Sequence, residues 1–305
     1  MKEMEPLLVD WKELRFGVEI EFVGGNPQQV ELWPGWIMAH DERQIDGDGA
    51  ESGSELKPPP IKWEDREQIR EMLMRLRATG AEANWNCGLH VHVGLEPWGE
   101  ESIPRFIEAA LLYQEVVRSL LDSSEARLPF CPPVTQEMRD RFISEPGSAA
   151  LYRKGRPQSH RCGINLAAWY DIGTVEIRYA NGSLDYDEVI NTVEFCLRFV
   201  AAIGAGQQLP CDPRRMAIAL GAPVGGYPPP IPAPQWYRER IWLENALVPI
   251  LTPLARSLVQ DGEILYILPR PDGILVAIED ANGDLSKHLV QLPSAGWEAV
   301  RLLQE

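Results

Sequence analysis

The sequence lacks the features that mark membrane, secreted and nucleic-acid-binding proteins. No uninterrupted apolar run approaches the about 18 residues that a membrane-spanning helix requires. The first 14 residues contain four acids and lack the basic-then-apolar order of a secretion signal. A net charge of −16 repels nucleic acid and anionic membranes alike. We therefore expect a soluble, cytoplasmic protein with no nucleic-acid and no membrane partner.

Cysteine is also scarce. The five cysteines are odd in number and scattered, which indicates reduced thiols rather than a disulfide framework. The 305 residues, of which 45% are hydrophobic and 24% charged, are ordinary globular material. They suffice for one or two domains with a full-sized core.

Common motifs for nucleotides, calcium and acyl transfer are missing. There is no Gly-x-x-x-x-Gly-Lys-Ser/Thr, and Gly204-Ala-Gly206 follows a helical segment without a third glycine. Asp46-Gly-Asp-Gly49 does not begin a calcium loop, because Lys57 stands where a bidentate glutamate is required. No Gly-x-Ser-x-Gly occurs. A P-loop, a Rossmann fingerprint, an EF-hand and a nucleophile elbow are thereby excluded.

Three pairs of polar residues stand in apolar, strand-like segments. Each pair is separated by one residue: Glu19 and Glu21, His90 and His92, Glu176 and Arg178. Since side chains alternate along a strand, both members of a pair project from the same face. Carboxylates hold Mg²⁺, while Arg and His neutralise or bind phosphate oxygens. The combination predicts a divalent-metal and phosphate site on one sheet face.

Each pair also has an ordinary interpretation. The two glutamates of the first pair can be a solvated strand face, and Glu176 with Arg178 can be a surface ion pair of little energetic consequence. The histidines can ligate zinc, since Cys87 stands three residues before His90, but no second Cys or His pair at finger-like spacing follows. Magnesium and nucleotide phosphate account better for the surrounding carboxylates. Because such polar pairs recur in three strand-like segments, we favour a functional site over these ordinary interpretations.

Hydrophobic periodicity predicts an α+β fold. The expected strands cover 14–23, 87–93, 164–168 and 174–179, and the expected helices cover 64–79, 102–121 and 185–200. Acids and glycines predict a loop over 40–57, and prolines predict irregular structure over 123–147. A basic stretch over 153–161 is either an anion contact or an exposed loop. Alternation of strands and helices predicts a layered α+β fold in which helices cover one face of a sheet.

Composition divides the chain into three parts. Residues 1–206 contain all three pairs, 207–234 form a proline-rich linker or covering arm, and 235–305 form an extension. In the extension we expect a helix over 236–259 that Pro249 and Pro253 interrupt, and a β-hairpin over 264–278. A short final helix is expected from Gly296.

Five strings, in this order, resemble the amidoligase family, a branch of the carboxylate-amine ligase superfamily that includes glutamine synthetase and the γ-glutamylcysteine ligases. The resemblance covers roughly residues 14 to 205. The strings are Phe16-Gly-Val-Glu-Ile-Glu-Phe22, Gly53-Ser-Glu-Leu-Lys-Pro58, Cys87-Gly-Leu-His-Val-His-Val-Gly94, Arg161-Cys-Gly-Ile-Asn165 and Thr174-Val-Glu-Ile-Arg178.

The resemblance implies a glutamine synthetase-like catalytic domain whose antiparallel β-sheet holds ATP and two or more Mg²⁺ or Mn²⁺ ions. By motif position the metal ligands are Glu19, Glu21, Glu55 and Glu176. The residues implied in nucleotide binding are His90, His92, Arg161, Asn165 and Arg178. The residues implied in catalysis are Arg178, Glu176 and His90. Asp41 is expected to join the acidic shell.

The implied activity is an ATP-dependent ligase that joins a carboxylate to an amine through an acyl phosphate. Its substrates would be small-molecule or peptide carboxylates and amines. Two alternatives stay open: a metal-dependent hydrolase that uses His90 and His92, and a non-catalytic nucleotide-binding protein on the same scaffold. Self-association into a homo-oligomer is also left open.

Overall fold

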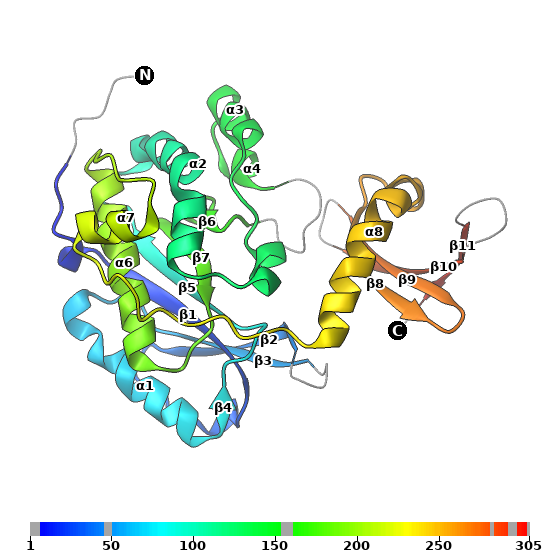
Figure 1. Cartoon of the computed structure of the whole chain (residues 1–305), viewed down its shortest axis with the longest axis horizontal. Helices are drawn as coiled ribbons and strands as arrows, with labels where there is room; N and C mark the ends of the chain where they lie inside the picture. Colours follow the sequence, from blue (N-terminus) through cyan, green and yellow to red (C-terminus); the bar gives the residue numbers. More distant parts are fainter. Residues whose placement is uncertain (1–6, 46–50, 154–160, 281–283, 292–297, 304–305) are drawn as a thin grey trace. The chain divides into compact units, whose positions relative to one another are not determined.

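The computed structural model describes residues 7–45, 51–153, 161–280, 284–291 and 298–303, and at 40–45, 51–52, 298 and 303 it describes the backbone only. The described residues form two compact units, one ending at Pro232 and the other beginning at Ala233 (Figure 1). Each unit has its own antiparallel sheet and its own hydrophobic core.

The first unit is built around a seven-stranded sheet in the order β2-β3-β1-β5-β7-β6, with β4 paired to β1. Every pairing in this sheet is antiparallel. The interior strands β1 and β5 carry two of the three polar pairs. The strands are β1 (Phe16–Gly24), β2 (Ile37–Ile45), β3 (Glu51–Lys57), β4 (Ala81–Glu82), β5 (Gly88–Gly94), β6 (Ile164–Asn165) and β7 (Thr174–Asn181).

Helices cover the apolar face of this sheet. Along β1 the side chains of Phe16, Val18 and Ile20 are buried in the core, while the residues between them are polar or glycine. Helix α6 packs against β5, and α2 packs against β7 (Figure 1). The helices are α1 (Glu67–Ala78), α2 (Ile103–Leu120), α3 (Gln136–Ser144), α4 (Ser148–Leu151), α5 (Ala168–Ile172), α6 (Tyr186–Gly204) and α7 (Pro213–Leu220).

Local sequence explains where the longest helix of the first unit begins. The side chain of Asp185 accepts hydrogen bonds from the backbone N–H groups of Asp187 and Glu188 and so caps α6. Glu188 accepts a hydrogen bond from Ser183, whose hydroxyl in turn accepts from the N–H of Asp185. The apolar stripe predicted for this segment is buried, including Val193.

Three predictions for irregular or strand structure are wrong. The expected loop over 40–57 is mostly the paired strands β2 and β3, because pairing with β1 compensates for the weak strand propensity of Glu, Ser and Gly. In the expected irregular stretch 123–147, the 3₁₀ helix η5 spans Glu125–Phe130, and Thr135 caps α3. Of the expected strand 164–168, only β6 forms, and α5 follows it.

The proline-rich segment 207–232 packs on the first unit. It contains α7, which contacts α2 and α6. Leu209, Met216 and Tyr227 are buried in the same hydrophobic core as the sheet. The backbone N–H of Leu209 donates to the hydroxyl of Tyr113 in α2. This segment therefore contributes to the fold of the unit that carries the polar pairs.

The second unit combines helix α8 (Gln235–Leu258) with a four-stranded sheet in the order β11-β10-β9-β8. The predicted hairpin is confirmed, because β8 (Glu263–Arg270) and β9 (Gly273–Glu279) pair in antiparallel register. Beside them lie β10 (Leu285–Gln291) and β11 (Glu298–Leu303).

Two predictions for the second unit are wrong. Pro249 and Pro253 do not interrupt α8, because both lie on its exposed side while Leu251 and Ala255 pack into the core. The expected final helix is instead strand β11 over its described residues, since pairing with β10 decides its conformation.

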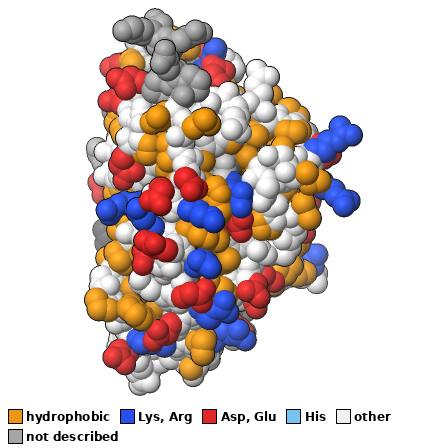
Figure 2. All heavy atoms as spheres, turned by 90° about the vertical axis from the view of Figure 1, so that its left-hand side faces the viewer, with side chains coloured by type: hydrophobic (Ala, Val, Ile, Leu, Met, Phe, Trp, Pro, Cys, Tyr) orange, Lys and Arg blue, Asp and Glu red, His pale blue; other side chains and the backbone are white. Residues whose placement is uncertain are grey.

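Taken unit by unit, the chain has a mixed α/β fold with antiparallel sheets. None of the helices in the described ranges is both long and apolar enough to cross a bilayer. On the face of the molecule displayed in Figure 2, acidic, basic and hydrophobic side chains are interspersed. The negative net charge is therefore not gathered into a single patch on that face.

Candidate functional site

Strand pairing brings the predicted side chains to one face of the first unit's sheet. Glu19 of β1 lies opposite His90 of β5, and His92 of β5 lies opposite Glu176 of β7. On the other side of β1, Glu21 lies opposite Glu55 of β3. Directly opposed residues have Cβ atoms about 4.5–5.5 Å apart. Four strands therefore contribute to one compact cluster of ionisable side chains.

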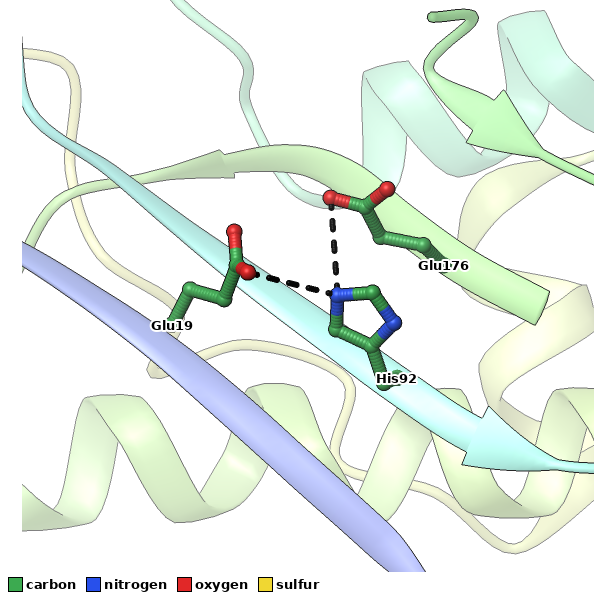
Figure 3. Close-up of side chains that lie close together, drawn as sticks. All are labelled: Glu19, His92 and Glu176. Carbon is green, nitrogen blue, oxygen red and sulfur yellow. Dashed lines mark ion pairs between the residues drawn. The ribbon is translucent and has the colours of Figure 1, made fainter. Parts of the chain in front are cut away.

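Glu19, His92 and Glu176 converge within this cluster (Figure 3). Nε2 of His92 is 3.7 Å from Oε1 of Glu19 and 3.7 Å from Oε1 of Glu176. The candidate ligand atoms of the three residues lie within 4.8 Å of one another, and no other group of acidic, His or Cys side chains in the described ranges has this spacing. We call these three residues the His92 group.

Nε2 of His92 is buried and lacks a hydrogen-bond partner in the described structure. Nδ1 of the same ring is 3.0 Å from Oγ1 of Thr174. When Nδ1 carries the proton and donates it to Thr174, Nε2 presents a lone pair toward the two carboxylates. A bound cation would relieve the resulting repulsion, and neutral imidazole is a good metal ligand. The donors of the His92 group therefore fit a divalent metal ion.

His90 differs from His92 because both of its ring nitrogens have partners. The side chain is 2% exposed, Nε2 is 3.0 Å from Nη2 of Arg127, and Nδ1 is 2.9 Å from Oε2 of Glu19. A guanidinium can only donate, so Nε2 accepts and the proton lies on Nδ1, which donates to Glu19. Burial and the charge of Arg178 lower the pKa of His90, which agrees with a neutral ring. His90 therefore orients Glu19.

Both carboxylate oxygens of Glu176 have partners in β6 and β7. Oε1 accepts from Nη1 of Arg178 at 2.5 Å, and Oε2 accepts from Nδ2 of Asn165 at 2.7 Å. Burial raises the pKa of Glu176, but the charge of Arg178, together with the nearby histidines, outweighs burial and places that pKa at about 2. Nε of Arg178 is buried without a hydrogen-bond partner in the described structure. It is a donor available to an oxygen of a ligand.

Lys57, at the end of β3, lies between two carboxylates. Its Nζ is 2.8 Å from Oε1 of Glu19 and 2.5 Å from Oε2 of Glu55. Burial and the charge of Glu19 raise the pKa of Glu55 to about 7, although Lys57 opposes this shift. Burial also raises the pKa of Glu19, but the hydrogen bond with His90 and the proximity of His92 outweigh burial and hold that pKa well below its usual range.

Glu21 is held by a backbone amide and a buried arginine. Oε2 accepts from the N–H of Gly88 and, at 3.4 Å, from Nη1 of Arg127. Residue 88 must be glycine because a Cβ there would overlap the Arg127 guanidinium. Burial raises the pKa of Glu21, but His90, Arg127 and Arg178 together lower it further than burial raises it. Glu21 is therefore ionised and tightly bound within the protein.

The predicted site residues thus separate by position. His90, Asn165 and Arg178 contact the His92 group, whereas Glu21 and Glu55 lie on the same sheet face outside that group. Arg161 is exposed, and its role stays a prediction. The side chain of Asp41 and most of the basic stretch, residues 154–160, lie outside the described residues.

Three residues of this face had no predicted role. Arg127 holds His90 and Glu21, Lys57 bridges two glutamates, and Thr174 binds His92. Lys57 and Thr174 could have been found, because each stands two residues from a predicted site residue on the same strand. Arg127 offered no such signal, since it comes from η5 and reaches the sheet only through the tertiary fold.

A family model described as "putative amidoligase enzyme" matches residues 31–200. The match contains β3, β5 and β7 and therefore three strands of the site, whereas β1 with Glu19 and Glu21 precedes it. No curated protein matches the sequence. Because the matched residues are more than half of the chain, the protein belongs to this family of amidoligases.

Proposed function

We propose that the protein is an ATP-dependent carbon–nitrogen ligase that joins a carboxylate to an amine, with a divalent metal ion at the His92 group. The observation that carries this proposal is the buried, unpartnered Nε2 of His92, 3.7 Å from one oxygen each of Glu19 and Glu176. Membership of the amidoligase family supports the ligase class. The antiparallel sheet with charged residues on one face supports a glutamine synthetase-like catalytic domain.

The donor set suits Mg²⁺ or Mn²⁺. Two carboxylates and one imidazole supply hard or borderline ligands and leave coordination positions for phosphate oxygens and water. Such an ion, when bound, neutralises charge on a phosphoryl group during transfer. Arg178 holds Glu176 in place, and its Nε, buried without a hydrogen-bond partner in the described structure, is the donor we assign to a ligand oxygen. Asn165 binds the other oxygen of Glu176 and fixes the carboxylate plane.

The proposed reaction follows from the weak electrophilicity of a carboxylate. Transfer of the γ-phosphoryl group of ATP to a carboxylate oxygen forms an acyl phosphate and releases ADP. Attack of the amine on the acyl carbon then expels phosphate and leaves an amide. Arg178 is the residue we assign to stabilise the transferring phosphoryl group. The substrates we propose are small-molecule or peptide carboxylates and amines.

A hydrolase with zinc bound by both histidines is disfavoured. Nε2 of His90 accepts from Arg127, and Nδ1 of His90 donates to Glu19, so neither nitrogen is available to a metal without breaking a buried hydrogen bond. A nucleotide-binding protein without catalysis would hold the same ion and nucleotide, and amine-dependent release of ADP separates it from a ligase.

Titration calorimetry with ATP tests the proposal. We expect Mg·ATP to bind the purified chain and metal-free ATP to bind at least about 10-fold more weakly, because clustered carboxylates repel a polyphosphate until cations intervene. Glu19→Gln should abolish this metal dependence. Equal affinity with and without Mg²⁺, or no ATP binding at all, would contradict the shared metal–nucleotide site. Amine-dependent release of ADP, screened over carboxylates, then tests the ligase step.

A further inference from the structure

Lys57 lies between Glu19 and Glu55, two of the predicted metal ligands. Its ammonium group contacts Oε1 of Glu19 and Oε2 of Glu55. The other oxygen of Glu19, Oε2, is already bound by His90. Glu19 therefore has one oxygen committed to the histidine and the other shared between Lys57 and the His92 group.

The charge balance of the face also limits the number of metal ions. Four carboxylates, those of Glu19, Glu21, Glu55 and Glu176, stand with three cations, those of Lys57, Arg127 and Arg178. With both histidines neutral, these groups sum to a charge of 0 when Glu55, whose pKa is raised to about 7, is protonated, and to −1 when all four carboxylates are ionised. One divalent ion changes the latter sum to +1, and a second would change it to +3. Concentrating that charge in a largely buried site is unfavourable unless a polyphosphate arrives with it.

We infer that Lys57 is an internal cation that takes the place of a second divalent ion between Glu19 and Glu55, so that the nucleotide-free protein binds one such ion per chain, at the His92 group. This inference rests on the proposed metal centre. Further ions then enter only with the phosphates of a nucleotide, whose charge they share. The expectation of two or more ions resident on the protein itself is thereby replaced by one ion and one ammonium group.

Counting bound Mn²⁺ by equilibrium dialysis or electron paramagnetic resonance tests this inference on the full chain without nucleotide. We expect one Mn²⁺ per chain in the unaltered protein. Lys57→Met should admit a second, weaker ion, because it uncovers the oxygens of Glu19 and Glu55. Lys57→Arg keeps the charge and should retain one ion. Lys62→Met is the matched control, since Lys62 also pairs with a glutamate, Glu13, at 2.6 Å but at an exposed position.

The number of Mn²⁺ ions bound per chain distinguishes a failure of this inference from a failure of the proposed function. Two ions in the unaltered protein, or one ion in both Lys57→Met and Lys57→Gln, would overturn the role of Lys57 while leaving the metal centre intact. No bound ion in the unaltered protein would overturn the metal centre itself. The count in the unaltered protein does not depend on any variant, so the test is decisive even where Lys57→Met fails to fold. Circular dichroism melting curves identify such a failure.

Discussion

Both units of the chain bury glutamates among polar partners, yet the two sites differ in whether a polar atom is left without a partner. In the second unit, Oε1 of the fully buried Glu244 accepts from Nε of Arg240 at 3.1 Å and from the N–H of Ile267 at 2.9 Å, which ties helix α8 to strand β8. In the first unit, Nε2 of His92 stands near two carboxylates without a hydrogen-bond partner in the described structure. Glu244 with its polar partners serves the fold, whereas a buried imidazole nitrogen left without a hydrogen-bond partner beside two carboxylates indicates a ligand.

The largest effect we expect would come from Arg178→Lys in the first unit. Lysine keeps the positive charge but lacks the planar guanidinium that can bind two oxygens at once. Stabilisation of a transferring phosphoryl group should therefore suffer more than ground-state binding of ATP. We expect the rate of amine-dependent ADP release to fall about 100- to 1,000-fold, with ATP affinity changed only a few-fold. The test requires a working substrate pair from the screen. Parallel loss of affinity and rate would instead identify Arg178 as a ground-state clamp.

A pair of matched substitutions tests the comparison directly. Glu19→Gln should weaken Mn²⁺ binding more than about 100-fold, because it removes a ligand charge while keeping the side-chain shape. Glu244→Gln should leave Mn²⁺ binding unchanged and lower the free energy of unfolding by about 1–3 kcal/mol, because it leaves Arg240 without its carboxylate. Calorimetry and urea denaturation measure the two quantities. The distinction between the two sites fails if Glu244→Gln also weakens Mn²⁺ binding.

The two histidines should respond differently to removal. His92→Ala should weaken Mn²⁺ binding about 10- to 100-fold with little loss of stability, since Nε2 has no hydrogen-bond partner and the ring loses only the hydrogen bond between Nδ1 and Thr174. His90→Ala should instead lower the free energy of unfolding by about 2–3 kcal/mol, because it removes the hydrogen bond between Nε2 of His90 and the buried guanidinium of Arg127. Both stability and Mn²⁺ affinity should be measured for each variant. Identical profiles would show that the histidines do not have separate roles.

The smallest effect should come from Thr174→Val, which removes the hydrogen bond to Nδ1 of His92. We expect about a 10-fold loss of Mn²⁺ affinity, typical of a residue that orients a ligand without touching the metal. Thr174→Ser keeps the hydroxyl and is the control that should bind Mn²⁺ nearly as well as the unaltered protein. Equal affinity of the valine and serine variants would mean that Thr174 does not orient the ring.

Sequence alone predicted three of the four strands of the site, β1, β5 and β7, because strand periodicity is a local property. Glu19, His92 and Glu176 stand in alternating apolar segments, and the period of two places each on the polar face without knowledge of the partners. Which carboxylates approach which histidine depends on register. Register joins residues more than 70 positions apart, such as Glu19 and His90, and is set by the packing of the whole sheet.

The failures arose where tertiary contacts outweigh local propensity. Strand β3 has a composition typical of a loop but pairs on both sides, with β1 and β2. Arg127 stands in a proline-containing 3₁₀ segment that carries no periodic pattern, so its contact with His90 could not be inferred. Strand β11 needed a neighbouring strand to define it. In each case the deciding interaction is distant in sequence.

The central position of β1 determines how far the chain can be shortened to a fragment that still folds. β1 lies between β3 and β5 but precedes the residues 31–200 matched by the family model. A fragment trimmed to that match would expose two unpaired strand edges at the middle of the sheet, which invites aggregation during expression. It would also discard Leu209, Met216 and Tyr227 from the core. A fragment worth purifying for crystallography therefore has to include both β1 and the segment up to Pro232.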